Sequence, residues 1–191
     1  MNLENTKILI AGEGGQGVQT TGKILAEAAF HQELKSLYVP NFGVEQRCGV
    51  SIAFVQISNQ ELTYPKFGKA DILVVLSERS IKRSENYISP QTKIISNSSL
   101  VPKNIFPSEN TITEIDATNI VNKEFMPQTL SIVVLGAILP FVPILQKENV
   151  KKTIKQQLGS KFKDKPELEE LNYKALEKGI DLINKKYADQ K

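Results

Sequence analysis

Residues 12–17, which read Gly-Glu-Gly-Gly-Gln-Gly, satisfy the pattern G-x-G-x-x-G that is typical of dinucleotide-binding turns. They follow the apolar run 7–11, which indicates a buried strand, and they open a segment with helical spacing of small and apolar residues. Glycines permit a tight turn, and the free amide groups at a helix start favour an anion. The pattern therefore predicts either a dinucleotide site or a turn that packs a strand against a helix or meets another chain.

A nicotinamide site needs one further group, and this chain lacks it at the expected place. An Asp or Glu at the end of the second strand, about 20 residues beyond the glycines, usually holds the ribose hydroxyls. That strand is predicted over residues 34–39 and runs into Pro40, so that Glu33 comes too early and Glu45 lies well into the next loop. A stand-alone NAD(P)-binding, Rossmann-like oxidoreductase is therefore kept only as the alternative hypothesis.

The composition limits the chemistry that the chain can carry by itself. Of 191 residues, 40% are hydrophobic and 24% charged, the balance of an ordinary globular protein, and the net charge of +3 is too mild to indicate nucleic-acid binding. One cysteine cannot form an internal disulfide or ligate an iron–sulfur cluster, and one histidine disfavours a zinc site. We expect no catalytic and no metal-ligating residues, so any redox centre must belong to another chain.

The order of predicted elements indicates an α/β fold. Strand-like runs alternate with helical segments, which predicts a three-layer α/β/α architecture with a mostly parallel, mixed sheet. The strands are expected near residues 7–11, 34–39, 51–57, 71–77, 93–97 and 111–115. An antiparallel hairpin is expected between 51–57 and 61–64, and Asp116 is expected to cap a short helix. One domain is predicted over 1–191, with 147–191 as its helical C-terminal part.

Membrane and export signals are weak. The most apolar stretch, residues 130–145, is shorter than the about 20 residues of a membrane span, and Pro140 and Pro143 interrupt it. It predicts a buried helix that ends near Pro140. Residues 1–6 lead almost directly into a strand and do not resemble a signal peptide. We therefore expect a cytoplasmic protein that does not enter a membrane.

Beyond the glycines, a longer series of motifs points to a family. The turn 12–17 is followed by the small-residue helix 22–29 and by the loop 42–51, which reads Phe-Gly-Val-Glu-Gln-Arg-Cys-Gly-Val-Ser. In this order they resemble the gamma subunit, or gamma domain, of the 2-oxoacid:ferredoxin oxidoreductases that act on pyruvate, 2-oxoglutarate and branched-chain 2-oxoacids. The likeness covers nearly the whole chain, continuing through residues 70–74, 96–100, 135–137 and 172–179.

The resemblance implies a role in a larger enzyme. Members of the family cleave a 2-oxoacid oxidatively on thiamine diphosphate with Mg²⁺, transfer the acyl group to coenzyme A, and pass electrons through iron–sulfur clusters to ferredoxin or another acceptor. The chain has no Gly-Asp-Gly thiamine motif, and we expect it to bind none of these cofactors alone. Its implied partners are alpha, beta and ferredoxin-like delta subunits, and its implied contribution is to assembly and to the coenzyme A side of the site. A pure scaffold without ligand contact is the third hypothesis.

The resemblance also selects candidate site residues. As cofactor-binding residues we predict Gly12, Gly14, Gly15, Gln16, Gly17 and Arg47. The loop 42–51 is expected at a subunit interface near the shared active site, with Arg47 as its main polar contact. The sequence departs from the family at Cys48, where a glycine is usual, and in the segment 128–131, where an asparagine is often found.

Other polar residues have a plainer interpretation beside the functional one. Arg47 with Glu45 could orient a phosphate or a carboxylate, or could form a loop salt bridge. Cys48 is predicted to behave as a small hydrophobe rather than as a reactive thiol, and His31 as a favourable charge at a helix end. Lys151, Lys152 and Lys155 could attract coenzyme A phosphates or an acidic partner, although a solvated helix face is favoured.

Overall fold

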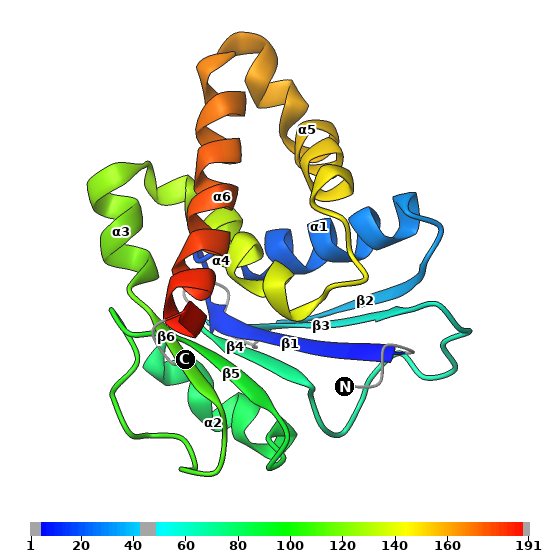
Figure 1. Cartoon of the computed structure of the whole chain (residues 1–191), viewed down its shortest axis with the longest axis vertical. Helices are drawn as coiled ribbons and strands as arrows, with labels where there is room; N and C mark the ends of the chain where they lie inside the picture. Colours follow the sequence, from blue (N-terminus) through cyan, green and yellow to red (C-terminus); the bar gives the residue numbers. More distant parts are fainter. Residues whose placement is uncertain (1–4, 43–48, 189–191) are drawn as a thin grey trace.

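The computed structural model describes residues 5–42 and 49–188, and these form a six-stranded sheet with helices on both faces (Figure 1). The strands lie in the order β2-β3-β1-β4-β5-β6. Their bounds are Asn5–Glu13 for β1, Lys35–Phe42 for β2, Val50–Ser58 for β3, Ile72–Val75 for β4, Lys93–Asn97 for β5 and Ile112–Ile115 for β6. The helices are α1 (Val18–His31), α2 (Ile81–Ser84), α3 (Ala117–Glu124), α4 (Leu130–Ile138), α5 (Lys147–Asp164) and α6 (Glu167–Ala188). Turns of 3-10 helix flank α2 (Glu78–Ser80 and Glu85–Tyr87) and α4 (Pro127–Thr129 and Leu139–Phe141).

Strand β3 runs against the other strands of the sheet. It pairs antiparallel with β1 on one side and with β2 on the other, whereas β1, β4, β5 and β6 pair in parallel. The predicted three-layer α/β fold with a mostly parallel, mixed sheet is confirmed. That the chain forms one domain over 1–191 stays a prediction.

The predicted hairpin partner of residues 51–57 was wrong. They pair with β2, in a register that places Phe42 opposite Ser51 and Lys35 opposite Ser58, and residues 61–64 form no strand. The reason is geometric, because a strand has two edges and β1 and β2 occupy both edges of β3. The antiparallel pairing therefore joins the strands on either side of residues 43–48.

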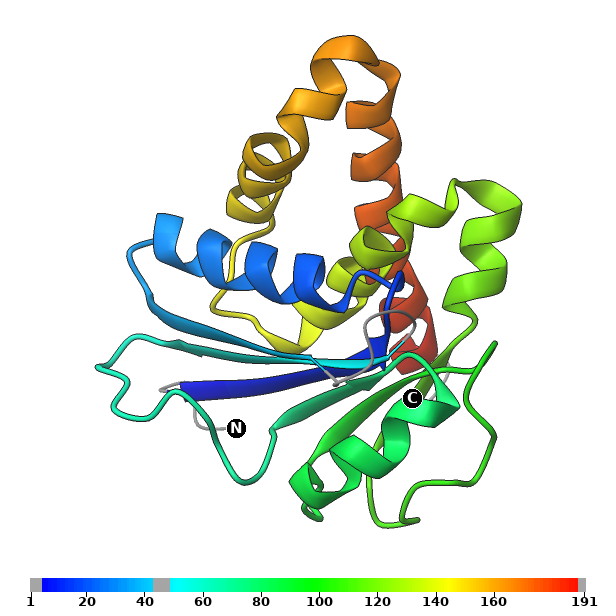
Figure 2. The same ribbon diagram turned by 180° about the vertical axis from the view of Figure 1, so that it is seen from behind.

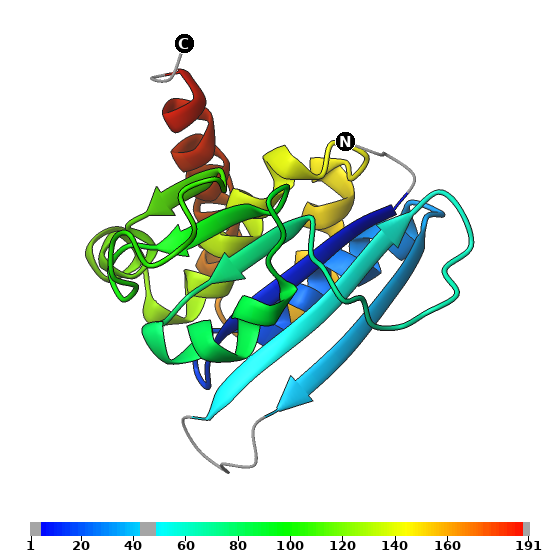
Figure 3. The same ribbon diagram turned by 90° about the horizontal axis from the view of Figure 1, so that it is seen from below.

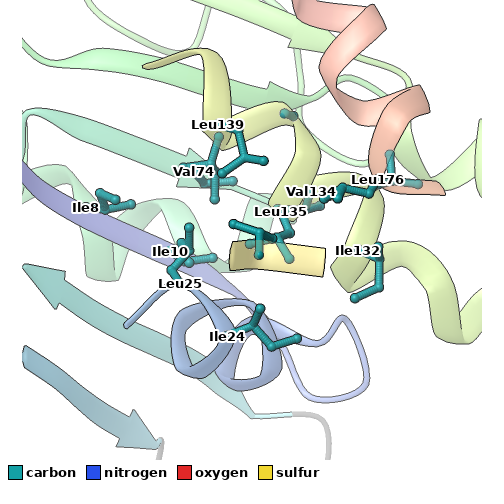
Figure 4. Packing of buried hydrophobic residues seen from close by; sticks show 14 of the residues in the cluster. Ile8, Ile10, Ile24, Leu25, Val74, Ile132, Val134, Leu135, Leu139 and Leu176 are labelled. Atoms are coloured by element: carbon teal, nitrogen blue, oxygen red, sulfur yellow. The ribbon is translucent and has the colours of Figure 1, made fainter. Parts of the chain in front are cut away.

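The two faces of the sheet are covered unequally. Helices α1, α4, α5 and α6 lie over one face, and α2 with its flanking turns lies over the other (Figures 1 and 2). Alternation along β1 serves both layers, since Ile8 and Ile10 join the larger core while Leu9 and Ala11 join the smaller one. Figure 4 shows Ile8, Ile10 and Val74 of the sheet beside side chains of α1 and α4 in the larger core.

Helix α4 is the centre of the larger core. All nine of its residues are buried, and the helix ends before Pro140, as the sequence predicts. A short helix that is apolar on every side must be covered all round, and here the sheet covers one side and α6 another. In the part of the chain that the structure describes, no helix is long and apolar enough to cross a membrane.

Helices α4 and α6 cross at two glycines. A Cβ atom at Gly136 would run into the carbonyl of Leu176, and one at Gly179 would run into the carbonyl of Val133. The two helix backbones therefore touch directly. Both glycines belong to segments that carry the family resemblance, and this contact is the physical reason for glycine there.

The crossing yields a stability prediction. Gly179→Ala forces the two helices apart and should lower the free energy of unfolding by about 1–3 kcal/mol. Gly159→Ala in α5 is the matched control: open space surrounds that position, so alanine should raise stability by up to about 1 kcal/mol through helix propensity. Urea unfolding of the full chain measures both changes. Equal stability for wild type and Gly179→Ala would contradict the tight crossing.

Candidate functional site

The glycine-rich turn lies where β1 ends and α1 begins, as the sequence predicts. Gly15 and Gly17 have left-handed backbones, with φ of 95° and 75°, a region that L side chains adopt at a cost. Gly17 is the N-cap of α1 and offers no side chain to the first-turn amide groups. We call this end of the sheet the carboxyl edge. Strands β1, β2, β4, β5 and β6 finish there, and β3 starts there.

The glycines of the turn divide into two kinds. Gly12 and Gly17 are packing positions: a Cβ at Gly12 would lie 2.9 Å from Val18 Cγ2, and one at Gly17 would collide with Ser131 Cβ in α4. Gly14 and Gly15 are exposed, and nothing lies within 4 Å of a Cβ built at Gly15. Two of the four glycines thus serve the packing of β1, α1 and α4, while the other two leave their backbone exposed at the carboxyl edge.

Gln16 fastens the turn to the neighbouring strand end. Its side-chain oxygen accepts a hydrogen bond from the Glu13 N–H at 2.7 Å, and its Nε2 donates to the Leu76 carbonyl at 3.1 Å. Both ends of the amide are therefore engaged within the chain, which gives Gln16 a positioning role. Contact between Gln16 and a cofactor stays a prediction.

The same carbonyl extends the network to the next strand. Asn97, fully buried at the end of β5, donates through Nδ2 to Leu76 O at 3.0 Å and to Thr118 Oγ1 at 2.9 Å. The ends of β1, β4 and β5 and the first turn of α3 are thus connected by side-chain amides. Buried amides whose partners are all present rigidify such an edge.

The predicted cap at Asp116 was wrong in its mechanism. Asp116 occupies the N-cap position of α3 but makes no side-chain bond to the first-turn amide groups. Its Oδ1 instead accepts from Ser99 Oγ at 2.5 Å and from Asn119 Nδ2 at 2.9 Å, while Ser99 Oγ accepts from the Asn119 N–H. The Ser99 hydroxyl, from the segment that follows β5, therefore caps the helix, and Asp116 holds that hydroxyl in place.

Two arginines at this edge were missed by the sequence analysis. Arg79 forms an ion pair with Glu13 at 3.1 Å. Arg83 donates to the Val50 carbonyl at 2.7 Å and to Asn41 Oδ1 at 3.0 Å. Their spacing of four residues after a buried strand was the available signal, since it places both on one face of a helical segment that starts at the carboxyl edge.

The predicted loop lies only partly within the described residues. Arg47, Glu45 and Cys48 fall in 43–48, outside them, so their roles stay predictions. The flanks are described: the N–H of Gly14 donates to the Gly49 carbonyl at 3.1 Å. The start of β3 therefore meets the glycine-rich turn, and the end of β2 and the start of β3 both lie at the carboxyl edge (Figure 3).

Several exposed apolar side chains lie near the carboxyl edge. Phe42 at the end of β2 is 67% exposed, and Leu100, whose carbonyl accepts from the Glu78 N–H, is 45% exposed. Met126, 42% exposed, precedes the helical turn that leads into α4, where Ser131 packs against Gly17. Aromatic, methionine and arginine side chains are the types that are enriched at protein interfaces.

The remaining polar candidates lie elsewhere. His31, exposed at the far end of α1, is 3.2 Å from Thr153 Oγ1. Lys151 and Lys155 pair with Glu177 and Glu169 at 2.8 and 2.9 Å and so link α5 to α6. The hydrogen bond to Glu177 raises the pKa of Lys151. Two of the three candidate lysines thus have structural partners in α6.

The family model described as pyruvate ferredoxin/flavodoxin oxidoreductase matches residues 7–182. The 2-oxoglutarate synthase subunit KorC of Methanocaldococcus jannaschii is 32% identical over 151 residues, which cover 78% of this chain and 81% of the relative.

Two solved structures share the fold. The gamma subunit of a keto/oxoacid ferredoxin oxidoreductase from Geobacter sulfurreducens superposes with a TM-score of 0.78 at 25% identity, covering 93% of this chain and 98% of that one. The 2-oxoglutarate:ferredoxin oxidoreductase of Magnetococcus marinus, solved with 2-oxoglutarate, coenzyme A and succinyl-CoA, gives a TM-score of 0.85 at 21% identity. This chain spans 31% of the Magnetococcus chain and is itself 95% covered. The chain therefore belongs to the pyruvate ferredoxin/flavodoxin oxidoreductase family, and its resemblance to the gamma subunits of 2-oxoacid:ferredoxin oxidoreductases is confirmed.

Proposed function

We propose that this chain is the gamma subunit of a thiamine-diphosphate-dependent 2-oxoacid:ferredoxin or acceptor oxidoreductase. It takes part in assembly and forms part of the coenzyme A side of the active site. The observation that carries the proposal is the carboxyl edge, where the outward-facing Gly14 and Gly15 lie between the start of α1 and the start of β3. The solved relative from Magnetococcus marinus, which holds coenzyme A, supports the choice of ligand.

The chemistry of the turn fits an anionic group. The first-turn amide groups of α1 have no side-chain cap, and the helix dipole adds partial positive charge there. Gly15 leaves room for close approach of a phosphate to the backbone. Among the predicted residues, Gly14, Gly15 and Arg47 are the ones we propose to face coenzyme A or the partner subunit.

The catalytic groups belong to partner subunits in this proposal. With one cysteine and one histidine, the chain lacks ligands for iron–sulfur clusters. We assign thiamine diphosphate and Mg²⁺ to alpha and beta subunits and the clusters to these and a ferredoxin-like delta subunit, in a cytoplasmic complex. The role of this chain is to bind, orient and exclude water at the edge that it contributes.

The strand order argues against the alternative of a stand-alone NAD(P) enzyme. In a dinucleotide-binding fold the second strand lies parallel beside the first, so that an acid at its end reaches the ribose. Here β3 lies between β1 and β2 and runs the opposite way. The end of β2 is thus two strands from the glycine-rich turn, and it carries Asn41 and Phe42 rather than an acid.

The first functional prediction concerns the isolated chain. Alone it should fold, but it should neither oxidise 2-oxoacids nor bind nicotinamide dinucleotides, because it lacks the thiamine motif and the ribose-binding acid. Dye-reduction assays with pyruvate and 2-oxoglutarate, and calorimetry with NAD(H) and NADP(H), test this. Micromolar dinucleotide binding would favour the alternative, and addition of the partner subunits should restore turnover.

The second prediction separates the two kinds of glycine. Gly14→Val should weaken binding to the partner subunits about tenfold, or about 1.4 kcal/mol, while the melting temperature of the free chain stays within about 2 °C. Gly12→Ala should do the reverse and cost the free chain about 1–3 kcal/mol, because its Cβ has no room. Gly68→Ala, exposed and away from the edge, is the neutral control. Normal assembly of Gly14→Val would mean that the turn serves packing alone.

The third prediction concerns Arg47. If the loop 42–51 is an interface segment, Arg47→Ala should weaken partner binding, or raise the KM for coenzyme A, about thirtyfold. This corresponds to about 2 kcal/mol, the scale of an interface hot spot. The free chain should lose under about 1 kcal/mol, as for an exposed loop ion pair. Affinity, steady-state kinetics and melting of the free chain are the measurements. Unchanged affinity and kinetics would make the loop ordinary surface.

A further inference from the structure

Arg83 joins the two strands that flank residues 43–48. One guanidinium nitrogen donates to the Val50 carbonyl at the first residue of β3, at 2.7 Å, and the other donates to Asn41 Oδ1 near the end of β2, at 3.0 Å. The side chain is half-buried and comes from α2, on the sheet face opposite α1 (Figure 3). The planar guanidinium of Arg83, which belongs to α2, thus bridges the end of β2 and the start of β3.

The Arg83 hydrogen bond to Val50 lies one residue from Gly49, which contacts the glycine-rich turn. Val50 lies opposite Glu13 in the β1–β3 register, and the carbonyl of Gly49 accepts the Gly14 N–H at 3.1 Å. The position of Gly14 therefore depends on the position of the first residues of β3, through this hydrogen bond. Arg79, one helical turn before Arg83, holds Glu13 at 3.1 Å from the same helical segment. The segment 78–84 thus contacts the turn at Glu13 and the strand that supports it at Val50.

The geometry requires arginine rather than any cation. Two acceptors on different strands are met by two nitrogens of one rigid plane, which a lysine ammonium on a flexible stem does not reproduce. Loss of the guanidinium removes a donor from the Val50 carbonyl and from the Asn41 side-chain oxygen, so that both strand ends lose the hydrogen bond that ties them to α2.

We propose that Arg83 is a positioning residue, which acts through Val50 and Gly49 to hold Gly14 in the arrangement that the partner subunit contacts. The proposal rests on the proposed function for the identity of the partner. Its structural half, the coupling from Arg83 to Gly14, stands independently of that function.

Amide hydrogen exchange in the full chain tests the coupling. Arg83→Gln should speed exchange of the Gly14 N–H by about fivefold or more, while the N–H groups of Ile8 and Val55 at the sheet centre change by less than about twofold. Arg83→Lys should give an intermediate value. Asn41→Ala removes one acceptor and should also speed exchange of the Gly14 N–H. This variant tests the coupling if Arg83→Gln folds poorly. Lys82→Gln, exposed on the same helix, is the matched control. Unchanged exchange at Gly14 in both Arg83→Lys and Asn41→Ala would overturn the proposal.

Affinity for the partner subunits is the second readout. A merely structural role of Arg83 would lower the melting temperature but leave this affinity unchanged. For the folded variant, Arg83→Gln should weaken binding to the alpha and beta subunits about tenfold, with partial rescue by Arg83→Lys and no change for Lys82→Gln. Faster exchange at Gly14 with wild-type affinity would overturn the positioning role. If the wild-type chain itself fails to bind these subunits, the proposed function is wrong, and the coupling is judged by exchange alone.

Discussion

The insertion of β3 between β1 and β2 is the constraint on which the rest of the carboxyl edge depends. Because β3 is reversed, it presents its first residues, not its last, beside the glycine-rich turn. The turn therefore contacts Gly49, and the end of β2 is displaced by one strand. The position that serves ribose recognition in a dinucleotide-binding fold is lost, and the start of β3 lies beside the turn instead. A shared glycine pattern thus occurs in a different arrangement of strands.

The glycine pattern itself is explained by two separate demands. Gly12 and Gly17 are needed because β1, α1 and α4 approach too closely for a side chain. Gly14 and Gly15 are exposed, and nothing within the described chain limits the space beside Gly15. A strand–turn–helix with the same spacing can therefore arise from packing alone at its two ends, so that only the middle of the pattern carries information about a ligand or partner.

The sequence predicted the elements whose signal is local. The buried runs of β1, β4 and β5 and the end of α4 before Pro140 follow from hydrophobic patterning and proline chemistry. The partner of β3 could not be predicted this way, since it depends on which strand edges remain free after the sheet forms. Arg83 was missed for a related reason, because its acceptors, Val50 and Asn41, are 33 and 42 residues away in sequence.

Hydrogen bonds, together with the close packing at Gly12 and Gly17, hold the carboxyl edge in place. Gln16 makes two, Arg83 makes two and the Gly14 N–H makes one, and each contributes a net of about 1 kcal/mol. The core around α4, by contrast, is close-packed down to backbone contact at Gly136 and Gly179, where any added atom costs more. The free energy that places the turn is therefore comparable with that of a few interface residues. The loss of one such hydrogen bond is therefore expected to shift the turn without disturbing the core around α4.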